Sequence, residues 1–384
     1  MFTLLVFLIV LSVIVLAHEW GHFISARKSG MAVHEFGLGF PPRAIGWYKD
    51  PQTQKWVKVN GKFDRTQAPS TIYSLNWLPL GGFVSIKGEE GEDTSPDSFI
   101  SQGFWKKVIT VVAGVLMNVV LASALLSIGY MVGLPQMADN LPASAVVGDR
   151  RLEIVQVFDN KPASEAGIVS GDVIIGVGDL DVPTLGEMQN YINENKDNEV
   201  LIKIQREGET IEKNIKPMVY EDTGKGGIGV ALADIGTVKY PFFKAIYHGV
   251  EATGYYLKAI VIAFYSLIMG LFTGNAGMLG EAAAGPVGIA VLTGQMARLG
   301  LGYLLQFTAL LSLNLAILNI LPIPALDGGR LVFLVIGKII RKPIGLKYEQ
   351  IAHTIGFMLL MLLMVVITIK DVGRFKDVFL NLFR

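Results

Sequence analysis

The chain has 384 residues, of which 51% are hydrophobic and 17% charged, and its mean hydropathy is +0.47. That is more apolar side chain than one soluble core can bury, which argues against a purely cytosolic protein. Lysine plus arginine and aspartate plus glutamate both number 33, so the chain lacks the positive field that nucleic-acid binding uses. There is no cysteine, which excludes disulfides, thiolate metal ligands and a cysteine nucleophile and leaves His, Asp and Glu as metal ligands.

The first apolar segment extends from Phe2 to Ala17 and on to Ile24, which is long enough to cross a bilayer. It has neither the positively charged start nor the small-residue cleavage site of a signal peptide. We therefore expect a retained membrane span over residues 1–24.

This span ends with His18-Glu19-Trp20-Gly21-His22, an HExxH motif. On a helix, residues four apart share one face, so both imidazoles can bind one Zn²⁺ ion while Glu19 acts as a base on the attacking water. Ionisable groups at membrane depth are costly and by default indicate function. Coincidence is a poor explanation, because the motif arises by chance in a chain of this length with a probability on the order of 1%.

The loop over residues 25–104 carries many lysines and arginines, whereas the extreme N-terminus carries none. The positive-inside rule therefore predicts that this loop is cytoplasmic and that the N-terminus lies outside. Within the loop, the Asn60-Gly61 pair between the alternating residues of Trp56 to Phe63 predicts a β-hairpin beside the membrane.

A second β-like stretch of this loop runs from Thr71 to Ile86. Its paired glycines, Gly81 and Gly82, permit close approach of another backbone. An ordinary surface loop is the alternative interpretation of this region.

The next apolar run, Val108 to Leu134, predicts a second span over residues 105–134, which places the long segment 135–240 outside. From about Leu152 to Met218 the composition is that of a soluble domain with alternating strands and one helix. The expected strands are residues 154–158, 172–177, 200–205 and 209–215, and the expected helix is 185–195.

Within this domain, Pro162 to Ile168 followed by Gly171 to Ile174 resembles the PDZ domains of bacterial envelope proteases. Such domains bind extended peptides by adding a strand to an exposed sheet edge. A spacer domain without a ligand of its own is the alternative.

Two further spans are clear, at Leu304 to Leu321 and Ile351 to Ile369. A fifth stretch, Ala252 to Phe272, has Lys258 as its one charge and can either span the bilayer or lie in the interface. Hydropathy therefore leaves four or five spans open. With four, the C-terminus lies outside, and the basic residues of the tail argue mildly against that placement.

Two histidines do not complete a catalytic zinc site, which needs a third protein ligand and an open position. No third ligand follows His22 at a short metalloprotease spacing, and His34 and Glu35 are displaced into the loop. Asp327 is the best candidate, because it follows the third clear span within the sequence that begins at Asn319 and continues Ile-Leu-Pro-Ile-Pro-Ala-Leu-Asp-Gly-Gly. Taken alone, a turn aspartate before two glycines is an equally good explanation.

HExxH in a first span, together with Asn-x-x-Pro-x-Pro-x-Leu-Asp-Gly-Gly in a later one, resembles the site-2 protease family of intramembrane zinc metalloproteases, of the bacterial RseP type. Pro79 to Val84 looks like that family's membrane-associated β-loop. Ala113-Gly114 with Asn118 looks like its second-span motif, and Gly285 to Ile289 looks like the segment before its third span. The resemblance covers nearly the whole chain.

The resemblance implies that His18, His22 and Asp327 bind zinc. It also implies that Glu19 is the catalytic base and acid and that Asn319 contacts the substrate or the developing oxyanion. A substrate span must unwind before it is cut, because a helix protects its own carbonyl groups.

The unwound segment is expected to add to the strand around Gly81, Gly82 and Phe83, while Asn319 anchors its backbone.

The fold implied is a polytopic α-helical membrane protein with about four spans, a membrane-associated β-hairpin loop and one inserted PDZ domain. Its parts are the first span (1–24), the cytoplasmic β-loop region (25–104), the second span (105–134), the extracytoplasmic PDZ domain with linkers (135–240), an interfacial helix and linker (241–302), and the third and fourth spans with the tail (303–384). The best known RseP proteins carry two PDZ domains, whereas this chain has room for one.

The remaining histidines, His34, His248 and His353, lack metal-ligand spacing and are expected at the surface or in interfaces. Asn118 is expected to make a packing or hydrogen-bonding contact between helices and not to take part in catalysis.

The activity implied is zinc-dependent cleavage of single-span membrane proteins, such as anti-sigma factors or remnant signal peptides, after a first cut outside a bacterial inner membrane. The expected partners are these substrates, peptide C-termini at the PDZ domain and the lipid bilayer, with no nucleic acid. Two other classes compete with this reading. One is a non-enzymatic membrane scaffold, and the other is a metal transporter, which would need several intramembrane acidic or histidine residues along a path.

Overall fold

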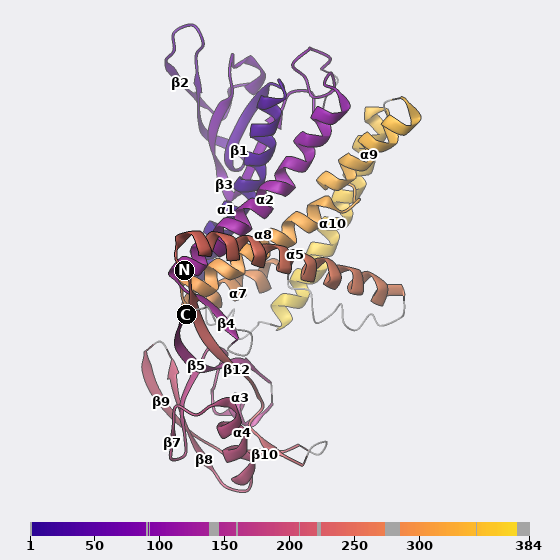
Figure 1. Cartoon of the computed structure of the whole chain (residues 1–384). Helices are drawn as coiled ribbons and strands as arrows, with labels where there is room; N and C mark the ends of the chain where they lie inside the picture. Colours follow the sequence, from indigo (N-terminus) through magenta and orange to yellow (C-terminus); the bar gives the residue numbers. More distant parts are fainter. Residues whose placement is uncertain are drawn as a thin grey trace. The chain divides into compact units, whose positions relative to one another are not determined.

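The computed structural model describes residues 2–89, 91, 93–137, 146–158, 160–206, 208–220, 224–272, 285–342 and 344–374. The chain divides into two compact units, each of which contains segments that are distant in sequence (Figure 1). The first unit comprises Met1–Leu126, Gly249–Gly294 and Leu305–Arg384, and the second comprises Ser127–His248 and Gln295–Leu304.

Among the described residues, five helices are long and apolar enough to cross a membrane. Continuous runs of Leu, Val, Ile and Phe favour helices here, because only a helix satisfies every backbone group within one such segment in lipid. These helices are α1 (Phe2–Lys28), α2 (Phe104–Val132), α5 (Phe242–Phe272), α8 (Leu301–Ile320) and α10 (Leu346–Arg374). Long apolar helices are thus present where spans were predicted, at α1, α2, α8 and α10, and α5 qualifies by length and composition as well.

The sequence suggested that Asp327 lies at the end of the third span. It lies instead in the first turn of a separate helix, α9 (Asp327–Ile340). The preceding helix α8 ends at Ile320 because Pro322 and Pro324 cannot continue its hydrogen bonding. A further unpredicted helix, α7 (Pro286–Leu299), begins with a proline at its first position, where a missing N–H costs nothing.

The loop between α1 and α2 folds into an antiparallel sheet of three strands, β1 (Val33–Lys49), β2 (Trp56–Asn60) and β3 (Ile72–Ile86). The β-like stretch predicted from Thr71 is therefore confirmed as β3. The long strands β1 and β3 bend, so that each contributes two segments to the sheet: Glu35 pairs with both Ile72 and Ser85, and Tyr73 pairs with both Phe36 and Trp47. In this register, residues 82–86 pair on one side with the first half of β1 and form an edge of the sheet among the described residues.

The hairpin predicted at Asn60-Gly61 is wrong in its position. The hairpin is formed by β1 and β2, where Lys49 pairs with Trp56, so that its turn lies at residues 50–55. Asn60 instead ends β2, and the chain there is held by Arg43, which donates hydrogen bonds to the carbonyl oxygens of Asn60 (3.2 Å) and Phe63 (3.0 Å). The Asn-Gly pair does form a turn, in which the Phe63 N–H donates to the Asn60 carbonyl oxygen at 3.2 Å, but this turn does not join two strands that pair with each other.

The second unit contains a sheet with the order β4-β12-β5-β6-β8-β9, in which β7 pairs with β6. Its elements are β4 (Leu134–Met137), β5 (Val146–Val157), α3 (Pro162–Glu165), β6 (Val173–Val177), β7 (Leu180–Asp181), α4 (Leu185–Glu194), β8 (Val200–Arg206), β9 (Glu209–Ile215), β10 (Met218–Val219), β11 (Gly226–Gly227) and β12 (Val230–Lys239). The strands and the helix predicted between residues 154 and 215 are confirmed.

The core of this second unit is formed by alternate residues of its strands and by the inner face of α4. Ile154, Ile202 and Ile204 are fully buried, as is Met188 of α4. The sequence suggested that linkers lead into and out of this core, but these segments are regular strands. They are the strands β4 and β12, which pair with each other from Leu134 to Met137.

Candidate active site

The two histidines of the HExxH motif lie on one face of α1, as their spacing requires. Both side chains are buried, and their Nε2 atoms are 3.1 Å apart. Two imidazole nitrogens at this distance cannot both keep their lone pairs directed at each other without a proton or a cation between them.

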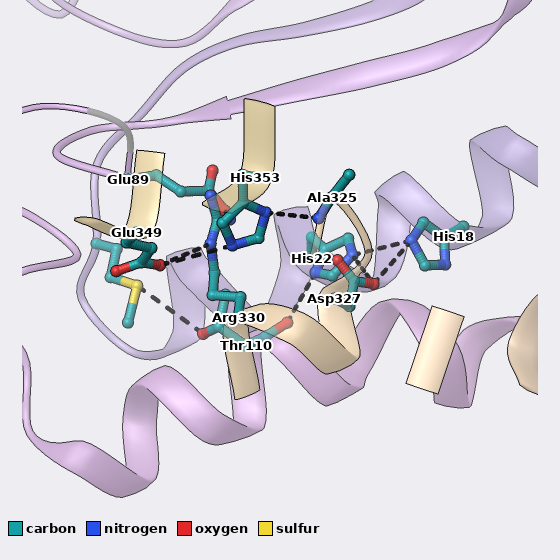
Figure 2. A network of polar contacts seen from close by, with 10 residues as sticks. His18, His22, Glu89, Thr110, Ala325, Asp327, Arg330, Glu349 and His353 are labelled. Carbon is teal, nitrogen blue, oxygen red and sulfur yellow. Dashed lines mark hydrogen bonds and ion pairs between the residues drawn. The ribbon is translucent and has the colours of Figure 1, made fainter. Parts of the chain in front are cut away.

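Asp327 completes a triangle with these two nitrogens (Figure 2). Its Oδ2 atom is 3.1 Å from Nε2 of His18 and 3.3 Å from Nε2 of His22. Donor atoms on a tetrahedral Zn²⁺ ion, at Zn–N and Zn–O distances of about 2.0–2.1 Å, lie about 3.3 Å from one another. Two imidazoles and a carboxylate with this spacing fit a catalytic zinc ion and leave a fourth position open.

Hydrogen bonds from outside the triangle orient the imidazoles. Nδ1 of His22 lies 2.8 Å from the carbonyl oxygen of Thr110 and donates its proton there, so Nε2 keeps the lone pair that a metal needs. The amide nitrogen of the fully buried Asn118 lies 3.5 Å from Nδ1 of His18. If Nε2 of His18 binds a metal, Nδ1 carries the proton, and the Asn118 carboxamide must then turn so that its oxygen faces Nδ1 and accepts it. Asn118 therefore makes the hydrogen-bonding contact expected of it.

Glu19 and Asn319 flank the triangle. The Asn319 amide nitrogen lies 3.3 Å from Nε2 of His18. Glu19 interacts electrostatically with both histidines and with Asp327. The structure thus brings the five residues predicted from α1 and from the Asn319 to Asp327 sequence to one place, although 300 positions separate them in the chain.

Glycines allow the helices to approach closely enough for this geometry. A Cβ atom on Gly114 of α2 would collide with the imidazole of His22, and one on Gly21 would collide with the carbonyl oxygen of Ala113. In α9, a side chain on Gly328 or Gly329 would collide with the carbonyl oxygens of the loop that precedes Asp327. Helices α1 and α2 can therefore approach this closely only because Gly21 and Gly114 have no side chain. The same holds for α9 and the loop before it at Gly328 and Gly329.

Of the residues predicted to bind substrate, Asn319 lies beside the triangle, whereas Gly81 and Gly82 lie against α1. A Cβ atom on Gly81 would lie 2.7 Å from the side chain of Val15, and one on Gly82 would lie 2.9 Å from that of Leu16. Gly82 and Phe83 begin the edge segment of β3 and pair with Leu38 and Gly37. This edge therefore lies against α1 about one turn before His18.

A second polar cluster next to the triangle was missed by sequence reasoning (Figure 2). Arg330 of α9 pairs with Glu89, and its Nε atom lies 3.9 Å from Glu349 of α10. His353 of α10 accepts a hydrogen bond from the backbone N–H of Ala325. The expectation that His353 lies at the surface or in an interface did not anticipate this contact, because its partner is a backbone group with no signature in the sequence.

Comparison with known proteins agrees with this site. The sequence profile of peptidase family M50 matches residues 6–59 and 55–363. CPE1693 of Clostridium perfringens is 33% identical over 365 residues, which cover 95% of this chain and 97% of that protein. The zinc metalloprotease RasP of Oceanobacillus iheyensis is 28% identical and covers 97% of this chain and 99% of its own. The regulator of sigma-W protease RasP of Bacillus subtilis is 27% identical, with coverages of 97% and 98%.

Among solved structures, the PDZ domain of the SdrC-like protein from Listeria monocytogenes is 23% identical and covers 22% of this chain and 90% of that domain, with a TM-score of 0.21.

Full-length similarity to zinc metalloproteases, together with apolar helices long enough to cross a membrane, defines the class of this protein as a membrane-embedded zinc metalloprotease. The chain belongs to peptidase family M50, and the predicted resemblance to site-2 proteases is confirmed. Its cofactor is Zn²⁺, as the sequence predicted.

Proposed function

We propose that this protein hydrolyses peptide bonds within single-span membrane proteins, with His18, His22 and Asp327 as its zinc ligands. The observation that carries this proposal is the triangle of two Nε2 atoms and one carboxylate oxygen at 3.1–3.3 Å. All three atoms can bind a proton or a cation, and the burial of His18 and His22 favours sharing one between them.

A bound zinc ion supplies the Lewis acidity that makes water a nucleophile at neutral pH. Glu19 accepts the proton of the attacking water and delivers it to the leaving amine, which is the role of a general base and then of a general acid. The Asn319 amide donates a hydrogen bond to the scissile carbonyl, where negative charge develops. The Thr110 carbonyl oxygen accepts the Nδ1 proton of His22 and so holds that imidazole in the tautomer that leaves Nε2 free.

Substrate enters as an extended strand along residues 82–86 of β3. This segment pairs on one side with β1, and its free edge offers backbone donors and acceptors to an unwound substrate. Gly81, Gly82 and Phe83 lie at its start, against α1. Asn319 then anchors the same substrate strand near the ligands. Replacement of Gly82 by Pro is expected to impair cleavage while zinc stays bound, and unchanged cleavage of a tester would contradict strand addition.

The substrate class follows from the same reasoning. The Bacillus subtilis relative is named a regulator of sigma-W, which supports membrane-tethered anti-sigma factors as substrates of this chain, with remnant signal peptides as a second group. Substrates are shortened outside before they reach the site, and the single PDZ domain binds the new peptide C-terminus or excludes longer chains. The protein lies in the bacterial cytoplasmic membrane with four spans, its N-terminus and PDZ domain outside and its active site near the cytoplasmic side.

The test compares wild type with Glu19→Gln on a single-span tester peptide in detergent, with zinc content assayed on the same samples. Wild type is expected to cleave, and the variant is expected to keep about one zinc ion per chain and to lose roughly 10²–10⁴-fold in rate. Cleavage by both proteins would remove Glu19 from catalysis. Absence of zinc from both would favour a membrane scaffold whose histidines serve packing.

A further inference from the structure

The loop that carries Asp327 follows a costly backbone path. Between α8 and α9 the chain passes through Ala325 at φ +79°, a left-handed conformation that is sterically unfavourable for a non-glycine residue. Such a conformation persists only where surrounding contacts determine it. Asp327 lies two residues later, so a change in the backbone conformation of Ala325 displaces its carboxylate.

The loop has few backbone donors with which to hold itself. Pro322 and Pro324 have no N–H, and the N–H groups of Ile323 and Leu326 are used inside the loop, on Leu321 (2.7 Å) and Ile323 (3.2 Å). The Ala325 N–H points out of the loop and donates to Nδ1 of His353, 2.9 Å away in α10. This bond therefore ties the strained residue to another helix (Figure 2).

Helix α10 approaches the loop between α8 and α9 closely at Gly356. Gly356 lies one turn after His353 on the same face of α10, and a Cβ atom there would collide with the backbone of Pro324. The side chain of His353 is thereby brought within reach of a backbone group that a more distant helix could not contact.

The far side of the imidazole fixes its orientation. Since Nδ1 accepts the Ala325 proton, Nε2 carries the ring proton, and it faces Oε1 of Glu349 at 4.0 Å. Glu349 lies one turn earlier in α10 and also faces Arg330, which pairs with Glu89. These charges favour the tautomer that the Ala325 contact needs.

From these contacts we propose that His353 is a positioning residue for zinc binding: it holds Ala325 in its left-handed conformation and so aims the Asp327 carboxylate at His18 and His22. The inference rests on the proposed role of Asp327 as a zinc ligand. His353 itself contacts no reacting group, and α10 thereby takes part in building a site whose ligands lie on α1 and α9.

The test measures the zinc dissociation constant of the full-length protein in detergent by competition with a chelator. His353→Leu fits the space, because the side chain borders a cavity of about 500 Å³, and it removes the acceptor. We expect a weakening of zinc binding of about tenfold or more. His353→Asn keeps an acceptor at the δ position and is expected to restore most of the affinity.

Thr354→Val is the matched control. Thr354 borders the same cavity from the next position of α10, and its hydroxyl bonds within its own helix to Gln350 at 2.8 Å. Its replacement is expected to leave zinc affinity at the wild-type value, which separates loss of the Ala325 contact from a general change in α10.

A second change separates positioning from folding. Glycine adopts positive φ without steric cost, so Ala325→Gly is expected to recover part of the zinc affinity of His353→Leu while changing the wild type little. Equal affinity in wild type and His353→Leu would overturn the proposal. The proposal would also be overturned if His353→Leu and His353→Asn lost zinc affinity equally and Ala325→Gly did not restore it. Asp327→Ala, measured in parallel, tests the zinc ligand itself: if that variant keeps full affinity, the proposed function fails whatever His353 does.

Discussion

Each unit of the molecule contains an aspartate that is shielded from solvent, fully at Asp172 and in part at Asp327, and the two are neutralised in different ways. In the second unit, Asp172 is fully buried, accepts the Val169 N–H at 2.9 Å, and receives Nε and a terminal nitrogen of Arg206 at 2.7 and 2.8 Å. In the first unit, Asp327 faces the Nε2 atoms of His18 and His22.

The comparison shows how a structural carboxylate differs from a ligand. Asp172 meets a guanidinium in bidentate geometry, so its countercharge is part of the chain and is present at all times. Asp327 meets two imidazoles whose other nitrogens are directed toward Thr110 and Asn118. These imidazoles are charged only when they bind a proton, so the countercharge comes from such a proton or from an added cation.

The largest expected effect comes from removing the ligand. Asp327→Ala should lose zinc binding and at least about 10³-fold in cleavage rate, because the metal supplies several kcal/mol of transition-state stabilisation. The second unit should keep its fold, since none of its elements contains this residue. Zinc content, cleavage of a single-span tester and protease resistance of the second unit are measured on one preparation. Retained zinc and activity would place Asp327 among structural carboxylates such as Asp172.

The reciprocal variant, Asp172→Ala, is expected to destabilise the second unit by about 3 kcal/mol, because removing one partner leaves the other charge uncompensated. The value lies at the low end for a buried pair, since the Arg206 side chain is 33% exposed and can be solvated. Urea unfolding of the full-length protein, followed by proteolysis within residues 152–215, gives the change. Zinc content per folded chain should stay at the wild-type value, and a loss of zinc here would contradict the division of roles.

A smaller effect is expected at Gly114, where space and not charge limits the site. A methyl group there collides with the His22 imidazole, so Gly114→Ala should weaken zinc binding about 10–100-fold by displacing one ligand. Gly254→Ala in α5 is the matched control, because a Cβ atom on Gly254 meets nothing within 4 Å. Equal zinc affinity of the two variants would show that α2 can shift away from α1 at little cost.

The chemistry of the site could be predicted from sequence because it depends on residue types whose burial is costly. His18, Glu19 and His22 stand out in an apolar span, and Asp327 follows from the need for a third ligand. The strands of the second unit could be predicted because their apolar residues alternate. The helix α9 and the hairpin turn at residues 50–55 could not, since prolines end α8 before α9 and the turn is held by Asp50, whose carboxylate accepts the N–H groups of Gln52 and Thr53.

The contact of His353 lay beyond prediction for a similar reason. Its partner is the backbone N–H of Ala325, which leaves no trace in residue identity, and the contact depends on the close approach of α10 at Gly356. Local patterns reveal which groups are expensive to bury, while the three-dimensional path of the chain decides what holds them in place.

The smallest effect is expected at the start of α4, where Thr184 and Glu187 form a capping box far from any buried charge. The Thr184 N–H and hydroxyl both donate to the Glu187 carboxylate at 2.8 Å, and the backbone hydrogen bond, followed by the hydroxyl, lowers the pKa of Glu187. Thr184→Ala should cost the second unit about 1 kcal/mol at neutral pH, because it removes the acceptor for the Glu187 N–H.

A carboxylate whose pKa is lowered on folding contributes stability above its unfolded pKa and loses that contribution as pH falls through its folded pKa. The difference in melting temperature between wild type and Thr184→Ala should therefore narrow as pH falls through this range, because the hydroxyl then has no carboxylate to donate to. A gap for Thr184→Ala that stays constant with pH would show that the cap acts through its backbone bond alone.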